Sequence, residues 1–142
     1  MAAGGVIAFK AIDVPDAFRG KERLRKWIRS IASGHGHSIG EVTFVLMTDK
    51  GLLPYNQRYL NHDEYTDVIT FDLQTGTGLS GDILISYDRV KENAATYGVS
   101  AQHELHRVMV HGLLHLMGFK DKTKTEQQAI RAAEDKWLAK LR

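Results

Sequence analysis

At 142 residues, with 43% hydrophobic and 25% charged residues, the chain has the length and composition of one globular domain. It has no cysteine, which excludes disulfide bonds and cysteine-ligated zinc. No apolar run approaches the ~20 residues that span a bilayer, and the first residues lack the basic and apolar regions of a secretory signal. We therefore expect one domain over residues 1–142, in the cytoplasm and without membrane contact.

The net charge of +2 is too small to indicate nucleic-acid binding, but the cations are unevenly distributed. Residues 19–29 contain Glu22 as their one acid and six cations, which are Arg19, Lys21, Arg23, Arg25, Lys26 and Arg29. Residues 119–142 contain seven basic and four acidic residues. Such runs occur both on phosphate-binding surfaces and on ordinary solvated helix faces, and the sequence does not decide between the two.

Short segments that are β-rich or continuously apolar, and that are bounded by turn residues, predict four strands. They cover residues 6–12, 41–48, 68–71 and 80–86. Because the second segment is apolar almost throughout, we expect it at the centre of a sheet. The fourth segment is expected to pair beside the third.

Helical periodicity and capping signals predict five helices. The first three cover residues 18–31, 49–59 and 87–97. Asp49 is the expected N-cap of the second, Ser100 that of the fourth, and Thr123–Glu126 is a capping box that opens the fifth. The order β-α-β-α-β-β-α-α-α indicates an α+β fold, in which one small mixed sheet of about four strands packs with helices.

Two histidines four residues apart stand in the fourth predicted helix, inside the apolar run 108–117. Positions i and i+4 share one helix face, so His111 and His115 are expected to point at the same spot. A helix that is apolar nearly all round is buried at the centre of the fold, and one divalent metal satisfies both buried rings. Gly118 is expected to end the helix, which allows Asp121 to return as a third ligand. Two histidines and a carboxylate suit Zn²⁺, and three protein ligands leave one position for water.

An HxxxH pair also occurs by chance on many helices, with both histidines in ordinary core positions. Here the burial, Gly118 and Asp121 favour a metal site. The glutamate of the HExxH metallopeptidase motif is replaced by Gly112, which disfavours a peptidase. Gly112 is instead expected to let another backbone segment approach the helix closely. His103 and His106 precede the apolar run and are left out of the site.

The stretch from His111 to Asp121 resembles the HGxLHLxGYDH signature of the YbeY family, metal-dependent bacterial endoribonucleases of ribosomal RNA maturation and ribosome quality control. The matching residues are His111, Gly112, Leu114, His115, Leu116 and Gly118, with Phe119 at the aromatic position. The family's usual third ligand is a histidine, and Asp121 stands in its place. Because aspartate is a competent zinc ligand, the resemblance implies a Zn²⁺ site of altered affinity or metal preference, in the fold of the family.

A second block resembles the family motif LNxxYRxKDxPTDVLSF. The matching residues are Asn56, Tyr59, Asp63, Thr66, Asp67, Val68 and Phe71. The family's arginine in this motif, considered important for activity, falls at Leu60, and its lysine falls at His62. Arg58 and His62 are candidate catalytic substitutes because they are close in sequence, although His62 also fits an exposed loop. Asp82, in a segment that resembles the family's GDI-type strand, is either an outer partner of the metal or a turn cap.

Three functions agree with these observations. A zinc-bound water loses its proton near pH ~7, while the metal polarises a phosphoryl oxygen, and the resemblance implies single-stranded RNA as the substrate class. The first hypothesis is a zinc-dependent endoribonuclease that hydrolyses ribosomal RNA precursors in the cytoplasm, with the ribosome or ribosomal proteins as candidate partners. The second is a metallohydrolase of another bond, such as an amide or a small phosphoester. The third is a ribosome-associated RNA-binding protein whose metal is structural.

Overall fold

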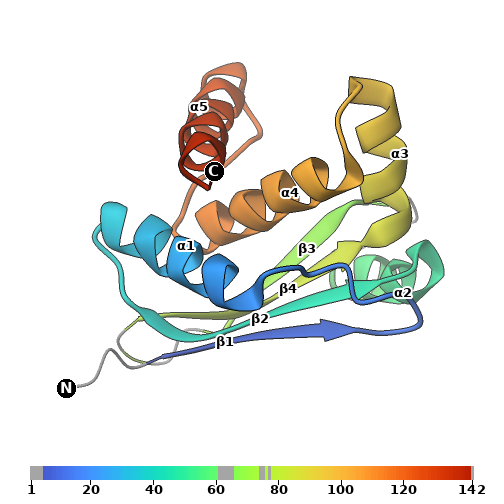
Figure 1. Ribbon diagram of the computed structural model, residues 1–142, viewed down its shortest axis with the longest axis horizontal. Helices are drawn as coiled ribbons and strands as arrows, with labels where there is room; N and C mark the ends of the chain where they lie inside the picture. Colours follow the sequence, from blue (N-terminus) through green and yellow to red (C-terminus); the bar gives the residue numbers. More distant parts are fainter. Residues whose placement is uncertain (1–4, 61–65, 74–75, 77, 142) are drawn as a thin grey trace.

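A computed structural model describes residues 5–60, 66–73, 76 and 78–141 and shows a sheet with helices packed on it (Figure 1). The four strands in this part of the chain are β1 (Val6–Ala11), β2 (Ile39–Met47), β3 (Val68–Asp72) and β4 (Leu79–Ser86). The five helices are α1 (Lys21–Gly34), α2 (Asp49–Leu60), α3 (Tyr87–Tyr97), α4 (Ala101–Leu116) and α5 (Lys124–Lys140). This order confirms the predicted α+β fold.

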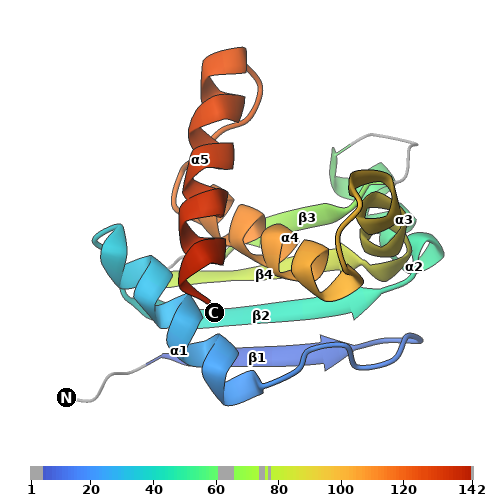
Figure 2. The same ribbon diagram turned by 45° about the horizontal axis from the view of Figure 1, so that its top comes forward.

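The strands form one mixed sheet in the order β1-β2-β4-β3. β2 pairs in parallel with β1 and β4, while β3 runs antiparallel to β4. The predicted central position of the second strand and the predicted pairing of the third with the fourth are both confirmed. Parallel neighbours need a crossover connection, and α1 provides the one between β1 and β2 (Figure 2).

Helices cover both faces of the sheet, because alternate side chains of a strand point to opposite sides. On one face, Ile83 and Ile85 of β4 belong to the main core, which side chains of α1 and α4 complete. On the other face, Leu84 packs with Leu52 of α2 in a smaller cluster. α4 lies across the sheet between α1 and α3, and most of its apolar side chains are fully buried (Figure 1). The expected buried helix with the histidine pair is therefore α4.

Gly112 determines how closely α4 approaches the sheet. A Cβ atom at this position would lie 2.6 Å from Ile83 Cγ2 and 3.3 Å from Thr70 Cγ2. The prediction of a close approach is correct, but the prediction that another backbone makes it is wrong. The neighbours are branched side chains of β4 and β3, which pack against the helix because glycine has no side chain of its own.

The start of α1 differs from the prediction, whereas the starts of α4 and α5 agree with it. α1 begins at Lys21 rather than at residue 18, because the residue before it, Gly20, has a left-handed φ of 63° that does not continue a right-handed helix. The Ser100 hydroxyl caps α4, and Thr123 and Glu126 form the predicted capping box of α5. None of the helices in the described ranges is both long and apolar enough to cross a membrane.

The N-cap of α2 is Thr48 and not Asp49, as the sequence had suggested. Thr48 Oγ1 accepts a hydrogen bond from the Gly51 N–H at 2.9 Å, which is the role of an N-cap side chain. The Asp49 carboxylate accepts instead from Ser86 Oγ at 2.6 Å and from Arg89 Nε at 3.1 Å. It therefore links the start of α2 to the start of α3.

Candidate metal centre

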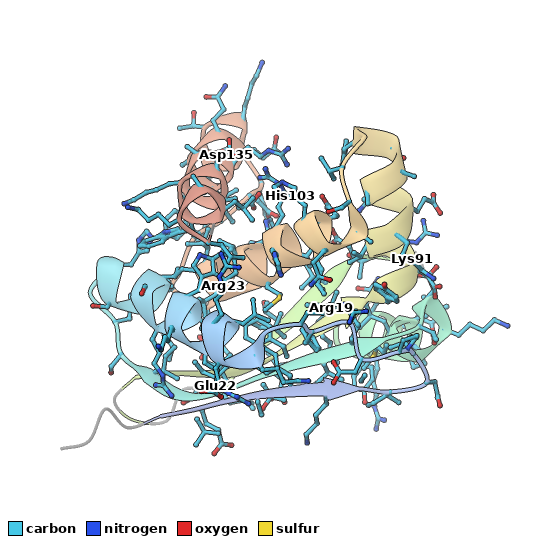
Figure 3. All side chains as sticks on the ribbon, viewed as in Figure 1. Arg19, Glu22, Arg23, Lys91, His103 and Asp135 are labelled. Atoms are coloured by element: carbon cyan, nitrogen blue, oxygen red, sulfur yellow. The ribbon has the colours of Figure 1, made fainter. Side chains whose placement is uncertain are left out.

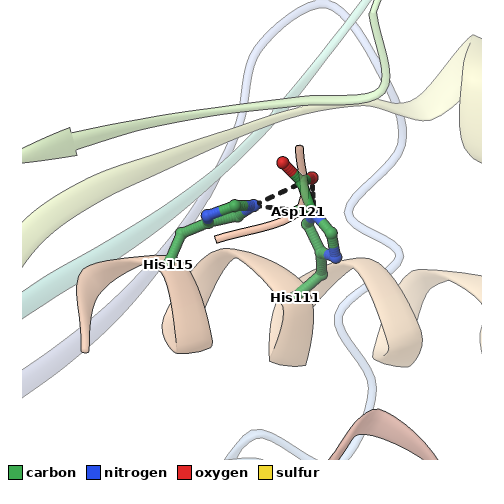
Figure 4. Close-up of side chains that lie close together, drawn as sticks. All are labelled: His111, His115 and Asp121. Carbon is green, nitrogen blue, oxygen red and sulfur yellow. Dashed lines mark hydrogen bonds and ion pairs between the residues drawn. The ribbon is translucent and has the colours of Figure 1, made fainter. Parts of the chain in front are cut away.

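His111, His115 and Asp121 meet at the C-terminal half of α4 (Figure 4). The two histidines stand one turn apart on the helix, and Asp121 returns from the loop before α5. His111 Nε2 lies 3.0 Å from His115 Nε2, while Asp121 Oδ2 lies 3.4 Å from the first nitrogen and 3.3 Å from the second. The structure thus brings together the three residues that the sequence selected, and their role as ligands remains a prediction.

The turn that returns Asp121 is formed by the end of α4. Gly118 has a φ of +100°, the left-handed conformation expected of a glycine just beyond a helix. The Phe119 N–H then donates to the Leu114 carbonyl at 3.0 Å, which folds the chain back over the last turn. The local sequence therefore brings Asp121 back to the helix face that carries His111 and His115.

The spacing of the three ligand atoms fits one divalent ion. Ligands at ~2.0–2.1 Å from a tetrahedral zinc lie about 3.3 Å from one another, and the separations here run from 3.0 to 3.4 Å. The side chains of His111, His115 and Asp121 are 23%, 24% and 41% exposed. An ion and a further, non-protein ligand can therefore reach this point from solvent.

A hydrogen bond on the opposite nitrogen orients each imidazole. His111 Nδ1 lies 2.6 Å from Glu134 Oε2, and His115 Nδ1 lies 2.9 Å from the Phe119 carbonyl oxygen. Because a carboxylate and a carbonyl accept hydrogen bonds, both Nδ1 atoms carry the proton. Both Nε2 lone pairs are then directed toward Asp121, in the tautomer that a metal-binding histidine needs.

Glu134 on α5 contacts this group of residues, and sequence reasoning missed it. It is 3% exposed, and its other oxygen, Oε1, accepts from Arg107 Nη1 at 2.9 Å. Arg107 Nη2 also donates to Asp135 Oδ1 at 2.8 Å. The sequence held one signal: Glu134 stands four residues after Ile130, within the apolar stripe of the last helix, and an acid in such a position needs a polar partner.

Burial and nearby charges shift the pKa values of several groups in this region. Burial lowers the pKa of His111, but the hydrogen bond and charge of Glu134, with the charges of Asp67 and Asp121, outweigh it, so the pKa is raised. Burial raises the pKa of Asp67, against the opposing charge of His111. Burial also raises the pKa of Glu104. Asp67 and Glu104 therefore hold a proton more tightly than exposed acids do.

A polar cleft of ≈ 270 Å³ opens beside the three residues, between α3, α4 and α5. Its charged and ionisable walls are Asp67, Glu104, Arg107, His111, Asp121, Arg131 and Glu134. Arg107 is held by two carboxylates of α5, as described above. Arg131 is exposed and makes no hydrogen bond or ion pair with any residue in the described part of the chain. The cleft therefore offers a cation that can meet an anionic group next to the predicted ligands.

The other residues considered from the sequence do not join this group. Arg58 lies on α2, which packs on the opposite face of the sheet, and it does not line the cleft. His62 falls outside the described residues. The alternation of β4 directs Asp82 away from α4, because its two neighbours in the strand face the helix. His103 and His106, which the sequence had excluded, line a separate cavity.

Comparisons with known proteins identify relatives of this chain and a similar fold. Endoribonuclease YbeY of Bacteroides thetaiotaomicron is 43% identical over 119 residues, which are 84% of this chain and 87% of that protein. Endoribonuclease YbeY of Cytophaga hutchinsonii is 44% identical over 134 residues, which are 94% of each chain. The solution structure of TM1509 from Thermotoga maritima has a similar fold, with a TM-score of 0.65 at 24% identity over 96% of this chain and 89% of that one. The family described as Endoribonuclease YbeY matches residues 10–142, and this chain therefore belongs to the YbeY family.

Proposed function

We propose that this protein is a zinc-dependent endoribonuclease that hydrolyses phosphodiester bonds in single-stranded regions of ribosomal RNA precursors. The observation that carries the proposal is the convergence of two Nε2 lone pairs and Asp121 Oδ2 at the wall of an open cleft. Membership of a family whose curated relatives are named Endoribonuclease YbeY supports the reaction class. Three protein ligands with an open side are typical of catalytic zinc, whereas structural zinc has four.

The residues of this chain would share the chemistry as follows. His111, His115 and Asp121 would hold the ion through Nε2, Nε2 and Oδ2. When bound, Zn²⁺ supplies a Lewis acid and a water whose pKa is lowered to about 7. Glu134 keeps the His111 Nδ1–H in place and so maintains the direction of Nε2. Asp67 lies in the same cleft with a raised pKa, so it can hold a proton and deliver it to the leaving oxygen.

Arg131 is the cation best placed to hold a substrate phosphate in this cleft. Arg107 is already engaged by Glu134 and Asp135, whereas no residue in the described ranges accepts a hydrogen bond from the Arg131 guanidinium. A guanidinium suits this task because it can bind two phosphate oxygens at once. Arg131 would thereby replace the arginine that the YbeY motif has at the position of Leu60.

The test of the nuclease proposal measures bound zinc and RNA cleavage in the same preparations. Wild-type protein purified without chelator is expected to hold about one zinc per chain and to cleave single-stranded RNA. His115→Ala removes one ligand and should lose both properties. His37→Ala, in the loop after α1, removes a histidine outside the cluster and should keep both. Full zinc content in a folded His115→Ala protein, or wild-type protein that binds zinc without cleaving RNA, would contradict the proposal.

The cellular part of the proposal rests on the family alone. In this proposal, residues 1–142 form one domain that acts on ribosomal RNA precursors in the cytoplasm. The domain would also contact the ribosome or its proteins. Cells whose copy of this protein carries His115→Ala should accumulate unprocessed ribosomal RNA, which gel analysis of total RNA would detect. Normal ribosomal RNA ends in those cells would restrict the enzyme to other RNA substrates.

A further inference from the structure

The fold divides the basic run of α1 into two groups of cations. One group is neutralised locally: Lys21 Nζ lies 2.7 Å from Asp16 Oδ2, and Arg25 pairs with Glu22 and donates to the Ile7 carbonyl. Arg29 likewise donates to the Gly5 carbonyl at 3.1 Å. These three side chains tie α1 to the chain around it, so they are explained by the fold.

The other group lines two adjoining cavities between α1, α4 and α5. The larger has a volume of ≈ 420 Å³ and contains Arg19 and Arg23. The smaller has a volume of ≈ 280 Å³ and contains Arg23 and Lys26 from α1 with Lys140 from α5. Arg23 and Leu141 belong to both walls, so the two cavities form one groove, which we call the α1/α5 groove. Arg19, Arg23 and His103 are labelled around it in Figure 3.

The cations of the α1/α5 groove are not balanced by acids. No aspartate or glutamate stands among the described residues that line either cavity. Arg23 is held at the junction by a hydrogen bond from Nη2 to the Leu141 carbonyl, which leaves its other donors available. The exposed side chains of Arg19, Lys26 and Lys140 make no hydrogen bond or ion pair with the described residues. Four positive groups therefore line one groove whose described walls contain no acidic side chain.

The arrangement of these cations suits a chain of phosphate groups. Arg23 and Lys26 lie about one turn apart on α1, Arg19 precedes the helix at one cavity, and Lys140 of α5 lies at the other, so the cations extend along the groove and do not form a single cluster. The remaining polar side chains of the walls are those of Ser30, Gln102, His103 and His106, which offer further hydrogen-bonding groups. The groove shares no lining residue with the cleft beside His111, and it is thus separate from the metal centre.

We infer that the α1/α5 groove binds the phosphate backbone of single-stranded RNA, away from the point of cleavage. This inference rests on the proposed function for its choice of RNA as the polyanion. The α1/α5 groove would hold one part of an RNA strand while another part of the strand occupies the cleft beside His111. The contacts would be mainly electrostatic, so binding should be independent of base sequence and should weaken with salt.

The test compares two variants of equal net charge. The first carries Arg19→Gln, Lys26→Gln and Lys140→Gln; the matched control carries Lys10→Gln, Lys50→Gln and Lys91→Gln, which remove three cations from β1, α2 and α3. Both are made in the His115→Ala background so that the RNA stays intact. The affinity for a fluorescent oligouridylate is measured by anisotropy over a range of salt concentrations.

Each phosphate contact with single-stranded nucleic acid contributes about −0.7 to the slope of log K against log salt. The groove variant should lose about 2 units of slope, so that between about 50 and 200 mM salt the control loses roughly 20-fold more affinity than the groove variant. Equal slopes in the two variants would overturn the inference. If the groove variant does not fold, the pair Lys26→Gln and Lys140→Gln, with an expected loss of about 1.4 units, is compared with the pair Lys10→Gln and Lys50→Gln.

The outcomes separate this inference from the nuclease proposal. RNA cleavage by wild-type protein together with equal salt slopes would overturn the groove and keep the nuclease. Absence of cleavage together with a reduced slope would overturn the nuclease and support the groove as a binding site. Loss of affinity for polyglutamate, with unchanged affinity for RNA, would identify the groove as a site for acidic proteins and would also overturn the inference.

Discussion

At the scale of single residues, Glu134 joins two helices around the predicted metal ligands. One carboxylate oxygen accepts from His111 and the other from Arg107, and the side chain is almost completely buried. A buried carboxylate is stable only when its oxygens are paired. Glu134 therefore has a structural role in joining α4 to α5 and an electrostatic role at His111, and a suitable substitution can separate the two.

We predict that Glu134→Gln weakens zinc binding by about 10- to 100-fold, because an uncharged amide orients His111 without raising the basicity of its ring. Asp135→Asn is the matched control, since it also removes a carboxylate from Arg107 but does not touch His111. Competition with a chromogenic chelator measures the affinity of both variants. Equal zinc affinity in the two would contradict the role assigned to Glu134.

Asp121 is the position at which this chain departs from the family signature. We predict that Asp121→His still binds zinc, because it restores the family's usual ligand on the same loop, whereas Asp121→Ala loses at least 10-fold in affinity. Metal analysis after gel filtration measures both variants. If a folded Asp121→His protein were free of zinc, Asp121 would not be a ligand.

At the scale of elements, α4 serves two sites on different sides. His111, next to His115, lines the cleft beside the candidate metal centre, while His106 lines the α1/α5 groove and packs edge-on against Trp27. His106 Nε2 is also within 3.3 Å of Gln102 Nε2. Burial, with the positive charges of His103 and Arg23, lowers the pKa of His106 from 6.5 to about 4. The protonated ring is therefore disfavoured in the folded state.

The lowered pKa of His106 makes the folding stability of the protein depend on pH. The pKa of His106 is lower in the folded chain than in the unfolded chain, so the unfolded chain binds the proton more tightly. The contribution of the neutral His106 ring to folding stability is therefore present above pH 6.5 and is lost as the pH falls toward 4. Its full size is about 3 kcal/mol. We predict that metal-free His106→Gln protein loses less stability between these pH values than metal-free wild type. Urea unfolding at several pH values measures the difference, and parallel curves would contradict the prediction.

At the scale of the whole molecule, α5 is attached to the rest of the fold through contacts at both ends. Near its C-terminal end, Trp27 Nε1 donates to the Trp137 carbonyl, and Arg23 donates to the carbonyl of Leu141. Near its start, Gln127 donates to the carbonyl of Asp121 in the loop that leads into the helix, and past the middle of the helix Glu134 reaches back to α4. A metal bound between α4 and this loop would therefore hold α5 in place.

We predict that zinc stabilises the folded protein by about 2.7 kcal/mol at a free concentration of 100 times its Kd, because the site exists only in the folded state. Thermal unfolding at several zinc concentrations measures this effect. His115→Ala should unfold at the same temperature with and without zinc. A zinc-dependent rise in the Tm of that variant would mean that the ion binds elsewhere.

The sequence by itself determined the features that depend on local periodicity. The order of strands and helices, the capping box at Thr123, the shared face of His111 and His115, and the turn at Gly118 follow from helix and strand geometry over a few residues. Local patterns failed where two capping groups compete, as at Thr48 and Asp49, because Ser86 at the end of β4 and Arg89 on α3 hold the Asp49 carboxylate.

Only the tertiary structure decided which distant side chains meet. Glu134 is 23 residues from His111, and its role depends on how α5 packs on α4. The raised pKa of Asp67 depends on burial beside helices that lie far from it in the sequence. The basic run of α1 was one feature in the sequence, and packing against the N-terminal segment and α5 divided it into paired cations and groove cations. Periodicity is a property of a few adjacent residues, whereas burial and charge pairing are properties of the packed chain.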